Sequence, residues 1–100
     1  MDNKEIAITV VSKITGVSRT KILSKTRVWP AVEARQFIIL LLSHDGATDE
    51  LIAWTLNRGR GAVLKSRHNA NDAIRLSKLF RDKYNKIKEA YELQKSLRAS

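Results

Sequence analysis

The spacing of apolar residues predicts helices along the whole chain. Apolar side chains recur every three or four positions, beginning with Ile6, Val10 and Ile14, and this spacing places them on one face of a helix. No run alternates apolar and polar residues as a half-buried strand does. No Asn-Gly or Asp-Gly turn joins two strand-like runs. We therefore expect an all-α fold.

Capping residues predict the limits of the first two helices. Asp2, followed three residues later by Glu5, has the spacing of a capping box and begins the first helix. Gly16 ends that helix, because glycine readily adopts the left-handed conformation of a helix C-cap. Ser18 is expected to cap a second, short helix whose core contacts include Ile22.

A buried central helix is predicted next. The segment 26–30 is expected to be a loop, and Pro30 is tolerated only in the first turn of a helix. The third helix should therefore begin between Pro30 and Glu33 and run to about Ser43. Its centre is apolar on all sides, which is typical of a helix surrounded by others.

A fourth helix is expected from Thr48, its N-cap, to Leu56. We predict that Leu51, Ile52 and Leu56 face the core and that Trp54 covers an edge of it.

Two glycines in the sequence Asn57-Arg58-Gly59-Arg60-Gly61 predict a tight turn. A fifth helix should begin by Ala62 and run to residue 75. Arg67 falls on the apolar side of that helix, where it must either extend its charged end to solvent or pair with an acid.

The last predicted helix runs from Ser77, its cap, to about Leu97. Its apolar stripe follows helical spacing through Leu76, Phe80, Tyr84, Ile87 and Tyr91. This stripe should pack against the core or against another copy of the chain. One continuous helix from Ala62 to Leu97 is the alternative. The fold class is thus a compact all-α bundle of five to six helices.

Composition narrows the class of protein. The chain has 100 residues and is 43% hydrophobic, so we expect a single folded domain spanning 1–100. There is no cysteine, and the longest apolar run, 37–42, is too short to span a bilayer. We therefore expect a cytoplasmic protein.

The net charge of +9 is concentrated in the second half of the chain. Residues 1–57 carry a net charge of +1, whereas residues 58–100 carry +8. Such an excess indicates an acidic partner, of which nucleic acid is the commonest. A basic surface that merely keeps the protein soluble is the alternative.

The helix pair 48–56 and 62–75, joined by a tight turn, has the outline of a helix-turn-helix. The second helix would then enter a DNA groove with its N-terminal residues at the bases. Arg58 and Arg60 lie in the predicted turn, and Lys65 faces outward one turn into the helix. An ordinary pair of helices in a bundle would show the same outline.

Several motifs occur in the order and spacing of a known family. They are Gly16-Val17-Ser18, Ile22-Leu23-Ser24-Lys25, Arg27, Ala34-Arg35-Gln36, and the run from Leu56 to Leu64. The stretch from about Val10 to Ile74 resembles the C-terminal double-stranded-DNA-binding domain (domain IV) of the bacterial replication initiator DnaA. The resemblance implies a Trp-repressor-like helix-turn-helix core at 1–75, followed by an extra C-terminal helix at 76–100.

The resemblance also implies roles for individual residues. Lys25 and Arg27 take the places of a basic loop whose second arginine enters the minor groove. Arg35 takes the place of an arginine that contacts phosphate, and Arg58 matches the arginine of the family signature.

The base-reading residues of that signature are replaced in this chain by Gly59, Arg60, Gly61 and Ala62. Phosphate contacts supply affinity, whereas base contacts supply sequence choice. We therefore expect duplex-DNA binding without recognition of the initiator's box. A nucleoid-associated regulator, or an accessory protein of a phage or mobile element, would fit.

Enzyme chemistry is not expected. Gly59 to Ser66 lacks the glycine that precedes lysine in a nucleotide-binding P-loop. His44 and His68 fall in different predicted helices without a nucleophile partner. We therefore predict no catalytic residue, no cofactor and no metal. Trp29 and Trp54 could stack on bases, although partly buried packing is the preferred interpretation.

Two other functions remain open. The chain could be a protein-interaction module that keeps the fold but has lost DNA reading, with its last helix docking a partner or a second copy. Structured RNA could also replace duplex DNA as the acidic partner.

Overall fold

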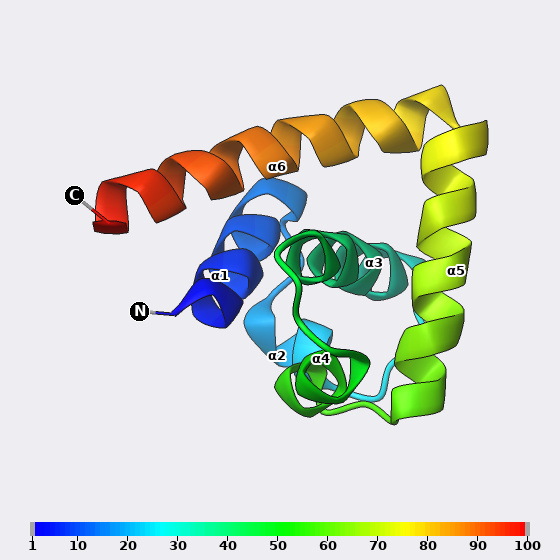
Figure 1. Cartoon of the computed structure of the whole chain (residues 1–100). Helices are drawn as coiled ribbons and strands as arrows, with labels where there is room; N and C mark the ends of the chain where they lie inside the picture. Colours follow the sequence, from blue (N-terminus) through cyan, green and yellow to red (C-terminus); the bar gives the residue numbers. More distant parts are fainter. Residues whose placement is uncertain (1, 100) are drawn as a thin grey trace.

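The chain folds into helices connected by short turns (Figure 1). The computed structural model describes residues 2–99, and within that range there is no strand. Helices account for 83% of the structure, which confirms the all-α prediction. They are α1 (Asn3–Thr15), α2 (Arg19–Leu23), α3 (Trp29–His44), α4 (Asp49–Leu56), α5 (Arg60–Leu76) and α6 (Lys78–Ala99).

The predicted caps are present. Asp2 accepts a hydrogen bond from the Glu5 backbone N–H at 3.0 Å, and the side chains of Ser18 and Thr48 accept corresponding bonds at the starts of α2 and α4. Gly16 ends α1 with φ +77°, a left-handed conformation that favours glycine. These local signals therefore set the helix limits as the sequence predicts.

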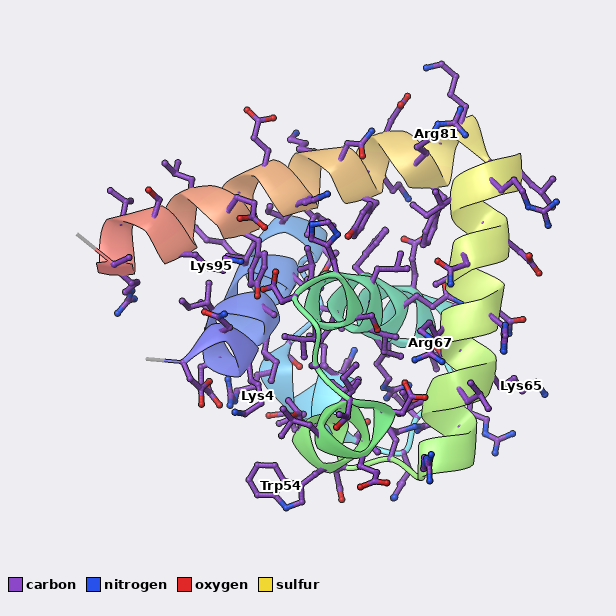
Figure 2. All side chains as sticks on the ribbon, viewed as in Figure 1. Lys4, Trp54, Lys65, Arg67, Arg81 and Lys95 are labelled. Atoms are coloured by element: carbon purple, nitrogen blue, oxygen red, sulfur yellow. The ribbon has the colours of Figure 1, made fainter. Side chains whose placement is uncertain are left out.

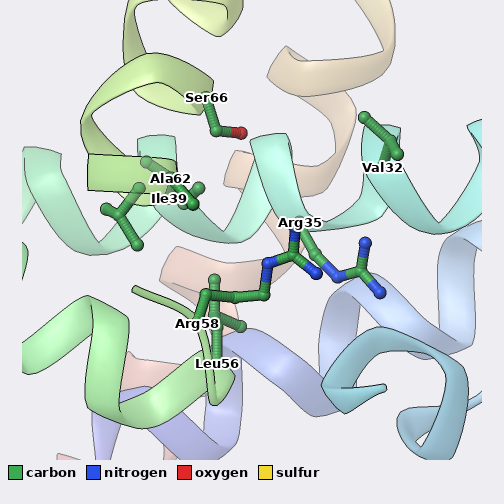
Figure 3. Close-up of a pocket in the computed structure, with 8 residues that line it drawn as sticks. Val32, Arg35, Ile39, Leu56, Arg58, Ala62 and Ser66 are labelled. Carbon is green, nitrogen blue, oxygen red and sulfur yellow. The ribbon is translucent and has the colours of Figure 1, made fainter. Parts of the chain in front are cut away.

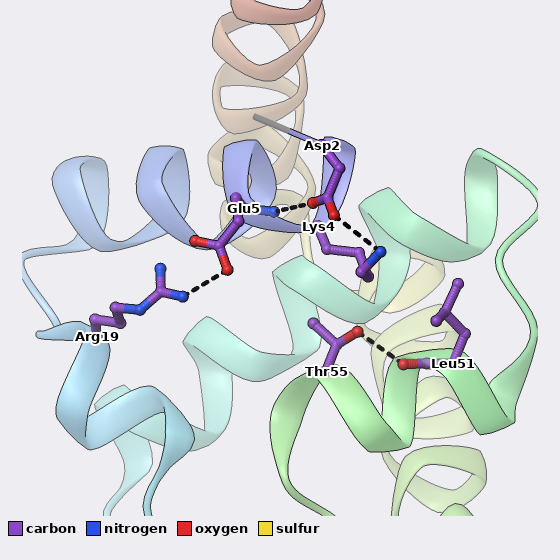
Figure 4. Close-up of polar contacts among 6 residues, drawn as sticks. All are labelled: Asp2, Lys4, Glu5, Arg19, Leu51 and Thr55. Atoms are coloured by element: carbon purple, nitrogen blue, oxygen red, sulfur yellow. Dashed lines mark hydrogen bonds and ion pairs between the residues drawn. The ribbon is translucent and has the colours of Figure 1, made fainter.

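The Glu5 carboxylate departs from the capping-box pattern. Its Oε1 accepts a hydrogen bond from the Arg19 guanidinium at 2.7 Å and so ties α2 to α1 (Figure 4). Asp2 also pairs with Lys4 at 3.1 Å. In α4, the Thr55 hydroxyl donates to the Leu51 carbonyl within the helix. The acidic residues at the start of α1 thus have two roles: Asp2 caps the helix, and Glu5 holds α2 against it.

Helix α3 forms the centre of the molecule. Every residue from Ala34 to Leu42 is buried, and α1, α2, α4, α5 and α6 all contact α3. Figure 1 shows α3 enclosed by α1, α4, α5 and α6. It begins at Trp29, one residue before the predicted range, and Pro30 lies in its first turn. The prediction of a buried central helix is confirmed.

Helix α6 folds back across the core. Ser77 separates it from α5 with an extended backbone (φ −118°, ψ 111°), and its Oγ accepts a hydrogen bond from the Phe80 N–H. The alternative of one continuous helix from Ala62 to Leu97 is therefore wrong.

The predicted stripe of α6 packs on the protein's own core. Phe80, Tyr84, Ile87 and Tyr91 are buried, and the Phe80 ring stacks on Phe37 with 4.7 Å between centroids. Leu76 is the exception, because it is 74% exposed at the end of α5. The stripe is thus not available to dock a second copy.

Helix α4 differs from the prediction in which face it buries. Ile52, Ala53 and Leu56 are buried, whereas Leu51 is 39% and Trp54 is 77% exposed. At 100° per residue, positions 51 and 54 share the face opposite to 52, 53 and 56. A helix of two turns at the edge of the bundle can bury only one of these faces. The prediction that Leu51 faces the core is therefore wrong, and so is the prediction that Trp54 covers an edge of it.

Helix α5 begins at Arg60, two residues before Ala62, and Gly59 provides its extended N-cap. Arg67 is half-buried and pairs with the Asp49 carboxylate, which links α5 to α4. This pairing is one of the two alternatives that the sequence left open for Arg67.

No helix within residues 2–99 is both long and apolar enough to cross a membrane.

A polar contact joins the end of α3 to α6. The Tyr91 hydroxyl donates to Asp45 Oδ2 at 2.5 Å, and Lys95 Nζ donates to the same oxygen at 2.9 Å. Burial by itself raises the pKa of Asp45. The two hydrogen bonds and the Lys95 charge together lower this pKa by more than burial raises it, so the net pKa lies below its ordinary value. The carboxylate is therefore more stable in the folded chain than in the unfolded one.

We predict that Asp45→Asn lowers the free energy of unfolding by about 1–2 kcal/mol near neutral pH, because two charge-assisted hydrogen bonds are weakened. A lowered folded-state pKa stabilises the protein above the unfolded-state pKa of about 3.9, and that contribution is lost as the pH falls through the folded value. Urea unfolding should therefore show the gap between wild type and variant closing between about pH 5 and pH 2.

Asp82→Asn is the matched control, because Asp82 lies on α6 and pairs with Lys78 in solvent. Its effect should stay within about 0.5 kcal/mol. A pH-independent loss for Asp45→Asn would contradict the assigned role of the Asp45 charge.

Candidate nucleic-acid interface

Helices α4 and α5 are joined by a turn of defined geometry. Asn57 adopts the left-handed conformation (φ 55°, ψ 44°), which asparagine tolerates better than most residues. The N–H of Arg58 donates to the Ala53 carbonyl at 2.9 Å, and the N–H of Asn57 donates to the Trp54 carbonyl at 3.3 Å. After the extended Gly59, α5 leaves in a direction very different from that of α4 (Figure 1). This is the arrangement of a helix-turn-helix.

The N-terminal half of α5 is anchored on one side only. Val63 is buried in the core, and Arg67 faces the inside of the bundle in its pair with Asp49. Figure 2 shows Lys65 on the outer side of α5, away from Arg67. Leu64, Lys65 and His68 are exposed. The first turns of α5 therefore present a free outer face of the kind that fits a groove.

The loop before α3 lies against the helix-turn-helix. Lys25 Nζ donates to the Asn57 carbonyl at 3.1 Å, although the two residues are far apart in the sequence. The ammonium group also lies at the C-terminal end of α4, where the partial negative charge of the helix dipole favours a cation. This contact brings one predicted basic element beside the other.

Five of the six predicted DNA-contacting residues reach the surface. Lys25, Arg27, Arg60 and Lys65 are exposed, and Arg58 is half-buried. Among residues 2–99, only Arg60 of these five has a carboxylate partner, Glu50 at 3.5 Å. Both members of that pair are largely exposed, so it contributes little stability and is easily exchanged for another anion.

Arg35 is placed differently from the prediction. Its side chain is 4% exposed, and its guanidinium donates to the carbonyls of Lys21, Ile22, Ser24 and Thr26 at 2.7–3.0 Å. The donors thus point at the C-terminal end of α2 and the following loop. We correct its role accordingly: Arg35 holds the basic loop in place from inside and is left out of the DNA-contacting set.

Arg58 lies beside the buried Arg35. Both residues line the same small pocket of about 50 Å³, between α3, the end of α4 and the start of α5 (Figure 3). Burial lowers the pKa of Arg35, and the charge of Arg58 lowers it further. Two like charges held together make this end of the helix-turn-helix attractive to an anion.

Both tryptophans depart from the preferred prediction of partly buried packing. Trp54 is 77% exposed and Trp29 is 58% exposed, with Val28 beside Trp29 at 64%. Figure 2 shows the Trp54 ring projecting from α4 into open space. The single exposed face of α4 is the signal that sequence reasoning missed, because Trp54 shares that face with Thr55 and Leu51.

Within residues 2–99, no group of three or more His, Cys, Asp or Glu side chains is arranged to hold a metal ion. No protein-family model, no curated protein and no solved structure matches the chain. The resemblance to domain IV of DnaA therefore stays a prediction based on motifs.

We predict that Arg35→Ala lowers the free energy of unfolding by about 3 kcal/mol or more, because it leaves several carbonyls without their charged donor. Arg35→Lys keeps the charge but cannot reproduce a forked set of hydrogen bonds, so it should restore only a minor part of the loss. Urea unfolding measures both.

Arg58→Ala is the control, since Arg58 is half-buried next to Arg35 and has no carboxylate partner within residues 2–99. It should change stability by less than about 1 kcal/mol. An Arg35→Ala variant that is fully stable but binds DNA weakly would reinstate the phosphate-contact role.

Proposed function

We propose that the protein binds duplex DNA through the α4–turn–α5 unit. The first turns of α5 would enter the major groove, and the loop that contains Lys25 and Arg27 would reach the adjacent minor groove. The observation that carries this proposal is the Lys25–Asn57 hydrogen bond. It joins the basic loop to the helix-turn-helix, so that both can act on one duplex.

The residues of this unit favour affinity over sequence choice. Arg58 and Lys65 are suited to phosphate contacts, and the free N–H groups at the start of α5 add donors for the same anion. Arg60 is the one side chain at the start of α5 with a fork that matches guanine. Gly61 and Ala62 offer no polar side-chain atoms for base contacts. We therefore propose weak or relaxed sequence preference and no recognition of the initiator's box.

A regulator of transcription or replication, or an accessory DNA-binding protein, fits this chemistry. Selection of bound sequences from a random duplex library tests the degree of specificity. One dominant motif would contradict relaxed preference, whereas tight binding without enrichment would support it.

We predict that Arg27→Ala, Arg58→Ala and Lys65→Ala each reduce the slope of log K against log salt by about one, because each removes one cation from the phosphate contacts. The three together should abolish most non-specific binding in a mobility-shift titration at several salt concentrations. Lys86→Ala is the control, since it removes the same charge from α6 and should leave the slope unchanged. An unchanged slope in the triple variant would overturn the proposal.

A protein-interaction module is the second candidate. The exposure of Trp54, Trp29 and Val28 favours it, because large apolar side chains on a surface mark contact sites more often than random positions do. The α6 stripe no longer supports this candidate, since it is buried in the protein's own core.

Light scattering separates the two candidates when it is combined with the mobility-shift assay. A stable dimer that Trp54→Ser dissociates, with no binding to any duplex at low salt, would favour the interaction module. A monomer that binds duplex would favour the DNA-binding proposal. Competition between duplex RNA and duplex DNA for the protein tests the RNA alternative, which stronger binding of the RNA would favour.

A further inference from the structure

A second basic pocket lies away from the helix-turn-helix. It occupies the inner side of the corner between α5 and α6, beside the C-terminal end of α3, and has a volume of about 380 Å³. Its polar lining includes Ser43, His44, Arg67, Asn71, Arg81 and Lys88, and no acidic residue lines it among those that the structure describes. Arg67, Asn71 and Ile74 of α5 line it, whereas the proposed DNA contact uses Arg58, Arg60 and Lys65.

The two arginines of this pocket are held by the fold. Arg81 Nη1 donates to the Ile74 carbonyl at 2.8 Å, which positions the guanidinium at the corner between α5 and α6 and leaves further N–H donors. Arg67 is held by its pair with Asp49, which offsets part of its charge. Guanidinium groups that are already oriented lose little freedom when they bind an oxyanion.

Lys88 supplies a charge that no carboxylate offsets. Among the described residues it makes no ion pair, and it lines the pocket from the middle of α6. The net charge of the lining is therefore positive even after the Arg67–Asp49 pair is taken into account. Figure 2 shows Arg67 on the side of α5 that faces α3 and Arg81 at the corner where α6 begins.

The Ser43 hydroxyl is an unsatisfied polar group at this pocket. Its Oγ is buried and has no hydrogen-bond partner among the described residues. A buried hydroxyl without a partner is unfavourable and rare, and Ser43 is one of the residues that line the pocket. Asn71 and Asn85 add amide donors at the rim.

We propose that this pocket binds the phosphate group of a small phosphorylated ligand. A phosphate carries three acceptor oxygens and up to two negative charges, which suits the guanidinium groups and the ammonium group that line this pocket from α5 and α6. Leu40, Ile74 and Tyr84 line the same pocket and provide apolar surface for an attached organic group. The proposal does not depend on DNA binding, because it uses other residues.

The test is a titration of the whole protein with inorganic phosphate at constant pH and ionic strength, followed by two-dimensional NMR of backbone amides. We expect saturable shifts in α3, α5 and α6 with a Kd of about 1 mM or lower. At ten times the Kd, the folded-to-unfolded ratio should rise about tenfold. Lys88→Ala should weaken binding at least about fivefold through loss of a charge-assisted contact.

Lys86→Ala is the matched control, because it removes the same charge from α6 but does not line this pocket. It should leave the Kd for phosphate unchanged. Arg81→Lys provides a second variant, which keeps the positive charge but removes the paired N–H donors of the guanidinium. Shifts that do not saturate, or equal losses in Lys86→Ala and Lys88→Ala, would overturn the proposal.

A nucleoside monophosphate and a short duplex distinguish the sources of the phosphate. Tighter binding of the nucleotide than of inorganic phosphate, with the same dependence on Lys88, supports a small organic phosphate. Duplex affinity that falls in Lys65→Ala but not in Lys88→Ala supports two separate sites. Duplex affinity that depends on Lys88, with no saturable phosphate binding, would overturn the small-ligand site and extend the DNA contact instead.

Discussion

Complete burial of the middle of α3 is the constraint on which the fold depends. Every residue from Ala34 to Leu42 is removed from solvent, so apolar partners are needed on all sides of one helix. The other helices provide them, and α6 closes the last side with Phe80, Tyr84, Ile87 and Tyr91. This explains why α6 turns sharply at Ser77 rather than continuing α5. A straight helix from 60 to 99 would leave both α3 and its own stripe exposed to water.

Arg35 is the one charged side chain inside this buried stretch, and its position determines the shape of the basic loop. A buried guanidinium is tolerated only where its donors are satisfied, and here four carbonyls of α2 and the loop accept them. The loop that carries Lys25 and Arg27 is thereby fixed next to the α4–α5 turn. A positively charged residue thus contributes to the proposed DNA surface without lying on it.

Local structure could be predicted well from the sequence, and the roles of individual side chains less well. The caps at Asp2, Ser18, Thr48 and Gly16 were correct because each depends on residues within one turn. Leu51 and Trp54 were misplaced because which side of a short helix is buried depends on its neighbours, not on its own period. Arg35 was misassigned for a related reason, since a motif match gives a position in the chain but not the direction of the side chain.

The sequence by itself determined the helical class, the buried centre, the positions of the caps and the excess of positive charge in the second half. These properties follow from composition and from the spacing of residues within one or two helical turns, because capping and amphipathic spacing depend only on neighbours in the sequence. Only the tertiary structure decided which charges are free. In the fold, Arg35 and Arg67 make internal contacts, and Lys25 donates a hydrogen bond to Asn57. Arg81 and Lys88 line one pocket together with Ser43. Such arrangements depend on how helices distant in sequence meet, and no local pattern encodes that.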